Sequence, residues 1–170
     1  PVIRQLAREM DSVLGNFLRG QGMVCVIQGT FYAAALMAAG LNYGLFVGFV
    51  GGLLSFIPFV GSIVGFMMAV GLATFQFWGD WLHIILIGGI FVFGQVVEGN
   101  YLTPKLVGGS VGLHPVWLLF SLSVFGALFG FVGMLIAVPV SAMIGVLVRF
   151  LVNRYLEGRL YRGLESLDED

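Results

Sequence analysis

Charged residues are scarce in this sequence. Only 10% of its 170 residues are Asp, Glu, Lys or Arg, whereas 59% are hydrophobic. A soluble domain usually carries about a quarter of charged residues, and a chain of this length cannot hide so much apolar surface from water. The mean hydropathy of +1.01 therefore indicates that lipid is the solvent. Because the apolar runs are continuous, without the period-two alternation of a membrane barrel, we expect an all-α polytopic membrane protein.

Side chains that could hold a metal or perform covalent chemistry are also few. Cys25 is the single cysteine, so an intrachain disulfide is excluded. His83 and His114 stand apart, outside any cluster with the spacing of metal ligands. The glycine-rich stretch GLFVGFVGG lacks the Lys-Ser/Thr ending of a phosphate-binding loop. We therefore expect no enzyme, no cofactor and no metal, and the lack of a basic stripe argues against nucleic acid as a partner.

The basic residues that are present lie at the two ends of the chain. Three precede the apolar body and four follow it: Arg4, Arg8 and Arg19, then Arg149, Arg154, Arg159 and Arg162. Positive charge favours the cytoplasmic side of a membrane. We therefore expect a multi-pass membrane protein with both termini in the cytoplasm, and hence an even number of crossings.

Three regions differ in composition. Residues 1–19 place apolar side chains at helical spacing and most charges on the other side, which predicts an amphipathic interfacial helix; a solvated lead-in to a spanning helix is the alternative. Residues 20–150 predict the transmembrane domain, and residues 151–170 a polar cytoplasmic tail. Since the chain begins with Pro1 and has no initiator Met, we expect a segment of a longer protein or a processed product.

Two of the apolar stretches are too long for one crossing. Residues 41–78 would make a helix of roughly 55 Å against a bilayer core of ~30 Å, so a break is expected near Pro58 and Gly61. Residues 116–150 are interrupted by Gly130, Gly133 and Pro139. We predict two broken or re-entrant helical hairpins, typical of the discontinuous helices of transporters. Either six full spans, or two spans over 20–39 and 81–97 plus two re-entrant hairpins, satisfy the even count.

Glycines recur at every fourth position in the first of these stretches. Gly44, Gly48 and Gly52 share one helix face, where another backbone can approach closely. Helix–helix packing is the favoured interpretation of this face, and a hinge or pathway lining is the alternative. The same property suits contacts between subunits, and a homo-oligomer is expected.

The polar stretch VVEGNYLTPKLVGGSVGLHP, residues 96–115, is exceptional within the apolar body. From residue 20 to residue 148 the charged side chains are Asp80, Glu98 and Lys105 alone. A carboxylate at the end of a span is costly unless it faces protein, water or a counter-ion. One interpretation makes Glu98 a proton or cation site; the other makes it a structural partner of Lys105 or a helix cap.

Several neighbours of Glu98 could assist it. Gln95 lies three residues before it and so shares its helix face, while Asn100 and Thr103 offer further neutral oxygens, and Lys105 could meet an anionic group. Pro104 and Pro115 are expected to end or begin helices, because the residue before proline disfavours the helical conformation.

These residues resemble a known family. The Glu-Gly-Asn-x-Leu-Thr-Pro-Lys element, followed by Val-Gly-Leu-His-Pro and Gly-x-x-Gly-x-x-x-Ala-Val-Pro, is similar to the signature region of the autoinducer-2 exporter family, the PerM-type permeases. FLRGQ at 17–21 and GLLSFIPFVGSIVG at 52–65 match as well. The resemblance implies the carboxy-terminal half of a longer transporter. The residues that match the family's motifs are Pro58, Glu98, Asn100, Thr103, Pro104, Lys105, His114, Pro115 and Pro139.

Three functions are compatible with the sequence. The first is a permease or exporter for a small polar solute or a monovalent cation, coupled to protons or sodium as in an antiporter, with Glu98 as the coupling carboxylate. The second is a passive oligomeric channel. The third is a non-transporting membrane scaffold in which Glu98 and Lys105 form a structural pair. In each case the lipid bilayer is a partner, and the first two add a small-molecule or ion substrate.

Overall fold

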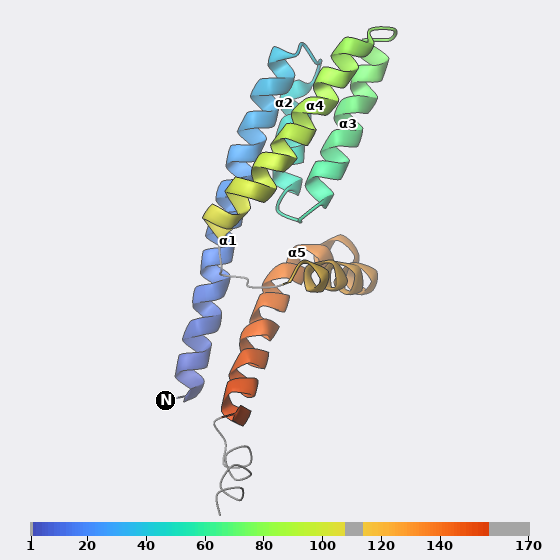
Figure 1. The fold of residues 1–170 in the computed structure, drawn as a ribbon. Coiled ribbons are helices and arrows are strands. Elements are labelled where there is room, and N and C mark those ends of the chain that lie inside the picture. The colour runs from blue at the N-terminus through green and yellow to red at the C-terminus, as the bar shows by residue number, and fades with distance from the viewer. Residues whose placement is uncertain (1, 108–113, 157–170) are drawn as a thin grey trace, which may run out of the picture. The chain divides into compact units, whose positions relative to one another are not determined.

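The computed structural model describes residues 2–107 and 114–156, and these residues are helical apart from short turns. The elements in chain order are α1 (Val2–Ala38), α2 (Gly44–Leu54), α3 (Val60–Gln76), α4 (Trp81–Val97), the π-helix η1 (Glu98–Val107) and α5 (Pro115–Leu156) (Figure 1). The all-α class is therefore confirmed. The chain divides into two compact units, residues 18–109 and residues 1–17 with 110–170.

Three helices are long and apolar enough to cross a membrane. They cover Arg4–Ala38, Trp81–Val107 and Val116–Leu156. The expected spans 20–39 and 81–97 lie almost entirely within the first two of them. In contrast, α2 has only 11 residues, so it is about 17 Å long and cannot traverse a core of ~30 Å as a straight helix.

A shared apolar core joins four helices in the unit formed by residues 18–109. Tyr32 and Leu36 of α1, Val47 of α2, Ala69 of α3 and Phe91 of α4 are buried in one cluster. The α1 and α2 backbones lie so close that a Cβ on Gly48 would collide with the backbone of Ala33. The glycine face of α2 thus packs against α1, as expected for small residues at a membrane helix interface.

The α2–α3 connection is a tight hairpin turn, and Pro58 lies in it. Gly61 belongs to the first turn of α3, where a Cβ would collide with the backbone of Ser55. The side chain of Gln21 in α1 donates a buried hydrogen bond to the backbone oxygen of Ser55 at 2.7 Å. The tip of this hairpin is therefore fastened to α1 by a polar contact.

The α3–α4 turn carries a polar cap among exposed aromatic side chains. Asp80 precedes α4 and accepts from the backbone N–H of His83 at 3.4 Å and from its ring Nδ1 at 2.6 Å. This donation from the His83 ring lowers the pKa of the Asp80 carboxyl below its ordinary value. Trp78 and Trp81 beside it are exposed, which suits a membrane–water interface.

Helix α5 is itself a hairpin. Gly130 has φ 61° and ψ −140°, a conformation that glycine tolerates and other residues avoid. The limbs on either side pack closely, since a Cβ on Gly133 would collide with the carbonyl oxygen of Phe125. Pro139, also expected as a break, lies buried inside the second limb with helical backbone angles. A proline can remain within a helix by bending it, so the reversal occurs at Gly130 instead.

Candidate functional site

The polar stretch after α4 is helical where the structure describes it. Residues 98–107 continue α4 as the π-helix η1, with Thr103 and Pro104 inside it. The sequence had suggested that the helix ends at this Thr-Pro pair. A π-helix is wider than an α-helix and often occurs at functional sites.

Glu98 lies at the junction of α4 and η1 and is buried, with 8% of its surface exposed. Its Oε2 accepts a hydrogen bond from Nε2 of Gln28 in α1 at 3.2 Å. The same amide nitrogen donates to the Tyr32 hydroxyl at 2.8 Å. The neutral amide of Gln28 thus donates to both the Glu98 carboxylate and the Tyr32 hydroxyl. These three groups form a buried polar cluster inside the apolar bundle.

The position of Tyr32 is set by α4. Its ring stacks on Phe91, with centroids 4.2 Å apart and planes 20° apart. Its hydroxyl end lies against Gly94, where an added Cβ would be 2.7 Å from the Tyr32 oxygen. Glycine at position 94 therefore makes the space in which the polar cluster forms.

Replacing Gly94 with Ala is expected to displace Tyr32 and lower stability by about 1–3 kcal/mol, the usual cost of overpacking a tight site. The measurement is thermal unfolding of the purified protein in detergent. Gly89→Ala on the same helix is the control, since nothing lies within 4 Å of a Cβ there. Equal melting temperatures for the two variants would contradict the close packing at Gly94.

Gln95 adds an unusual feature one turn before Glu98. Its Oε1 is buried and has no hydrogen-bond partner within the part of the chain that the structure describes. A buried acceptor without a donor costs free energy. It is also an oxygen that a cation or a solute donor can use.

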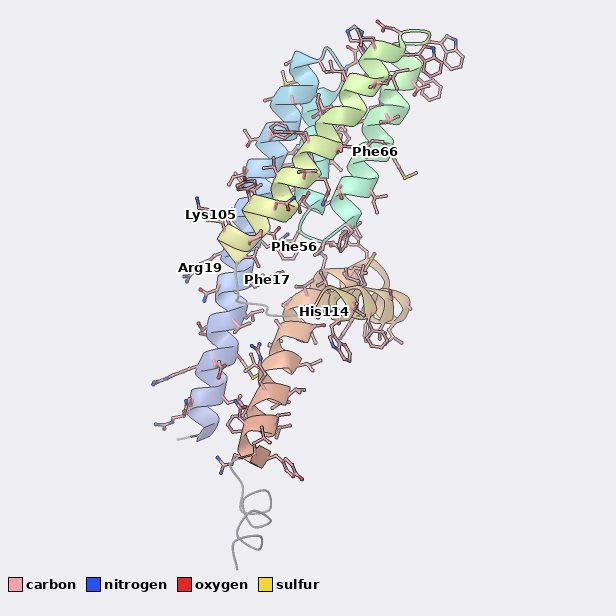
Figure 2. All side chains as sticks on the ribbon, in the orientation of Figure 1. Phe17, Arg19, Phe56, Phe66, Lys105 and His114 are labelled. Carbon is pink, nitrogen blue, oxygen red and sulfur yellow. The ribbon has the colours of Figure 1, made fainter. Side chains whose placement is uncertain are left out.

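The remaining predicted residues lie apart from this cluster. Asn100 is exposed and donates to the backbone oxygen of Val96 at 2.8 Å, and Thr103 is half-buried in η1. Lys105 is exposed and projects outward from η1 (Figure 2). Among the described residues it forms no ion pair with Glu98. The structure thus brings Glu98 to Gln28 and Tyr32, and leaves Lys105 at the surface.

The predicted hinge residues have different positions. Pro58 is in a turn, Gly61 in α3, Pro104 in η1, and Pro139 in the second limb of α5, while Pro115 is the first residue of α5. Pro104 and Pro139 are therefore inside helices, and Pro115 is at the position where proline is best tolerated.

Sequence reasoning missed Gln28 and Tyr32. A signal existed: Gln21, Gln28 and Tyr32 are seven and four residues apart in an otherwise apolar span, and so share one helix face. Polar side chains aligned in this way inside a membrane helix point to a buried polar partner.

Comparison with known proteins identifies the family to which these helices belong. The model of the AI-2E family transporters matches residues 2–153. YrrI of Bacillus subtilis (strain 168) is 36% identical over 143 residues, which cover 83% of this chain and 39% of YrrI. The permease PerM of Escherichia coli (strain K12) is 31% identical over 85% of this chain and 40% of its own length. The AI-2 transport protein TqsA of the same strain is 27% identical over 83% of this chain and 40% of the length of TqsA.

The chain thus spans about two fifths of the length of these relatives. The family match itself extends over most of the described helices, from the start of α1 to near the end of α5. This chain belongs to the AI-2E transporter family, which is a family of transporters and not of enzymes.

Proposed function

We propose that this chain forms part of a permease or exporter that moves a small polar solute or a monovalent cation by alternating access. Transport is coupled to protons or sodium, and Glu98 is the coupling carboxylate. The observation that carries this proposal is the burial of Glu98 against Gln28 and Tyr32, with no ion pair to a basic side chain among the described residues.

The physical reason is the free-energy cost of burying an ionised Glu98 carboxylate. An ionised carboxylate buried without a counter-charge is expensive, and one hydrogen bond from an amide offsets only part of that cost. A proton or a monovalent cation on Glu98 removes the charge. The neutral oxygens of Gln95 and Tyr32 are then available as further ligands, and Asn100 and Thr103 extend the set toward the surface.

The proposed arrangement in the membrane has two re-entrant hairpins. The 11-residue length of α2 supports this for the α2–α3 hairpin, and the non-helical backbone at Gly130 supports it for α5. Residues 1–19 lie at the interface, residues 151–170 form the cytoplasmic tail, and both termini are cytoplasmic because of their arginines. The membrane is the bacterial inner membrane, and the protein is a homo-oligomer.

The name of TqsA, an AI-2 transport protein, supports a small polar solute as the cargo class. A monovalent cation is the other candidate, supported by the buried oxygen of Gln95, which lies one helical turn before Glu98 and has no partner among the described residues. The transport assays should therefore include both small polar solutes and monovalent cations.

The test is flux through the whole protein reconstituted in proteoliposomes. A carrier with a bound intermediate gives a rate that saturates with substrate concentration. A passive oligomeric channel, the second candidate, gives a rate that keeps rising in proportion to concentration. Saturation for at least one member of the panel is expected, and a linear dependence for every permeant would overturn the carrier assignment.

A further inference from the structure

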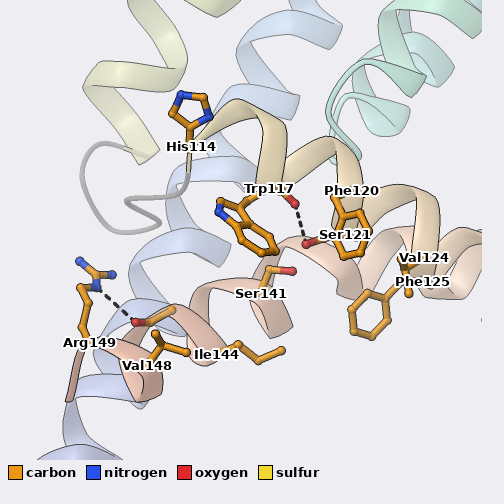
Figure 3. A pocket seen from close by; sticks show the side chains of 11 residues that line it. His114, Trp117, Phe120, Ser121, Val124, Phe125, Ser141, Ile144, Val148 and Arg149 are labelled. Carbon is orange, nitrogen blue, oxygen red and sulfur yellow. Dashed lines mark hydrogen bonds between the residues drawn. The ribbon is translucent and has the colours of Figure 1, made fainter. Parts of the chain in front are cut away.

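A second polar feature lies in α5, in residues that the proposed transport function does not use. The two limbs of this helix line a half-open pocket of about 500 Å³, a volume within the usual range of ligand sites. Most of its wall is apolar and aromatic, with Trp117, Phe120 and Phe125 on the first limb and Ile144 and Val148 on the second (Figure 3).

The polar groups gather at one end of this pocket. His114 precedes the first limb and Arg149 lies late in the second, so both are far from the Gly130 turn in an antiparallel hairpin. Figure 3 shows them at the same end, with Phe120, Val124 and Phe125 toward the other. The pocket therefore has a cationic mouth and an apolar interior.

Both groups at the mouth keep donors that have no partner among residues 2–107 and 114–156. Arg149 uses its Nε to donate to the backbone oxygen of Gly145 at 3.3 Å, which leaves its two terminal nitrogens. The His114 Nδ1 accepts from the backbone N–H of Val116 at 3.4 Å, which leaves its Nε2 for a ligand. No Asp or Glu occurs between residues 114 and 156, and the charge of the site is wholly of one sign.

We propose that this pocket binds an anionic phospholipid of the surrounding bilayer. One acyl chain lies along the aromatic wall, and the phosphate accepts hydrogen bonds from Arg149 and His114. The positive charge at the mouth favours an anionic lipid head group, as in other basic pockets between membrane helices. The apolar interior favours a ligand that carries an acyl chain over free phosphate.

Trp117 reports directly on this pocket. In a Trp78→Phe, Trp81→Phe background it is the sole tryptophan of these 170 residues, any tryptophan in the rest of the whole protein is also replaced by Phe, and bromine on an acyl chain quenches the Trp117 fluorescence on contact. The whole protein is placed in mixed phosphatidylglycerol and phosphatidylcholine bilayers, with bromine on one lipid or the other at equal mole fraction. Stronger quenching by the brominated phosphatidylglycerol is expected, corresponding to an association about fivefold tighter for the anionic lipid.

Three variants make the test specific. Arg149→Gln should abolish the lipid preference, whereas Arg154→Gln, which removes a cation outside the pocket wall, should keep it. Val124→Phe should fill the apolar interior and lower the quenching by both lipids. Excess inorganic phosphate should not reverse the quenching.

Three results would overturn the proposal. These are equal quenching by the two brominated lipids in the unmodified pocket, a preference that survives Arg149→Gln, or no quenching by either lipid. The last result would mean that another part of the protein or a second copy covers the pocket.

Discussion

Replacing Glu98 with Gln is expected to abolish gradient-driven transport while expression, oligomer size and thermal stability stay close to those of the unmodified protein. Glutamine has nearly the same shape and keeps an oxygen that can accept the hydrogen bond from Gln28. It loses the charge and the ability to take up a proton or hold a cation. Initial flux rates in proteoliposomes measure the effect.

Two controls separate coupling from general effects of charge. Glu9→Gln removes an exposed carboxylate of α1 and should leave flux unchanged. Lys105→Gln should also be nearly silent, because Lys105 is exposed and makes no ion pair with Glu98. If the scaffold interpretation were right, Lys105→Gln and Glu98→Gln would have similar effects, since both would break one structural pair.

Replacing Gly48 with Leu is expected to destabilise the α1–α2 interface strongly. Even a Cβ at this position would meet the backbone of Ala33 and lie 2.7 Å from the carbonyl carbon of Tyr32. Backbone atoms cannot rotate away as a flexible side chain can, so α2 must move from α1. A loss of about 3 kcal/mol is expected, which corresponds to a fall in melting temperature of about 10 °C.

The matched control is Gly71→Leu in α3, where nothing lies within 4 Å of an added Cβ. It should change the melting temperature little, and the added side chain should meet lipid. Because Tyr32 is next to Ala33, Gly48→Leu should also impair transport. A melting temperature equal to that of the Gly71 variant would show that α1 and α2 do not pack through this face.

The helices of this protein follow from local rules, whereas its polar cluster does not. The α2–α3 turn contains Pro58, which cannot donate within a helix, and α5 reverses at Gly130, whose positive φ suits glycine. The composition and the length of the apolar segments are also enough to distinguish a membrane protein from a soluble one. These features need only the residue itself or its near neighbours.

The contact between Gln28 and Glu98 joins residues 70 positions apart, and no local pattern specifies it. Sequence reasoning offered Lys105, the nearest opposite charge along the chain, as one possible partner of Glu98 and did not identify Gln28. Within the helical segment that joins them, Lys105 is at the surface while Glu98 points into the bundle. The winding of residues 98–107 as a π-helix likewise depends on packing that a single sequence does not reveal.

The central claim is that Glu98 couples transport to an ion gradient. The most direct measurement imposes proton and sodium gradients separately across proteoliposomes that contain the whole protein, with saturating substrate, and compares the initial flux with and without Glu98→Gln. We predict that one of the two gradients drives flux in the unmodified protein and that the Glu98 variant no longer responds to it. An equal response to the gradient in both proteins would contradict the account.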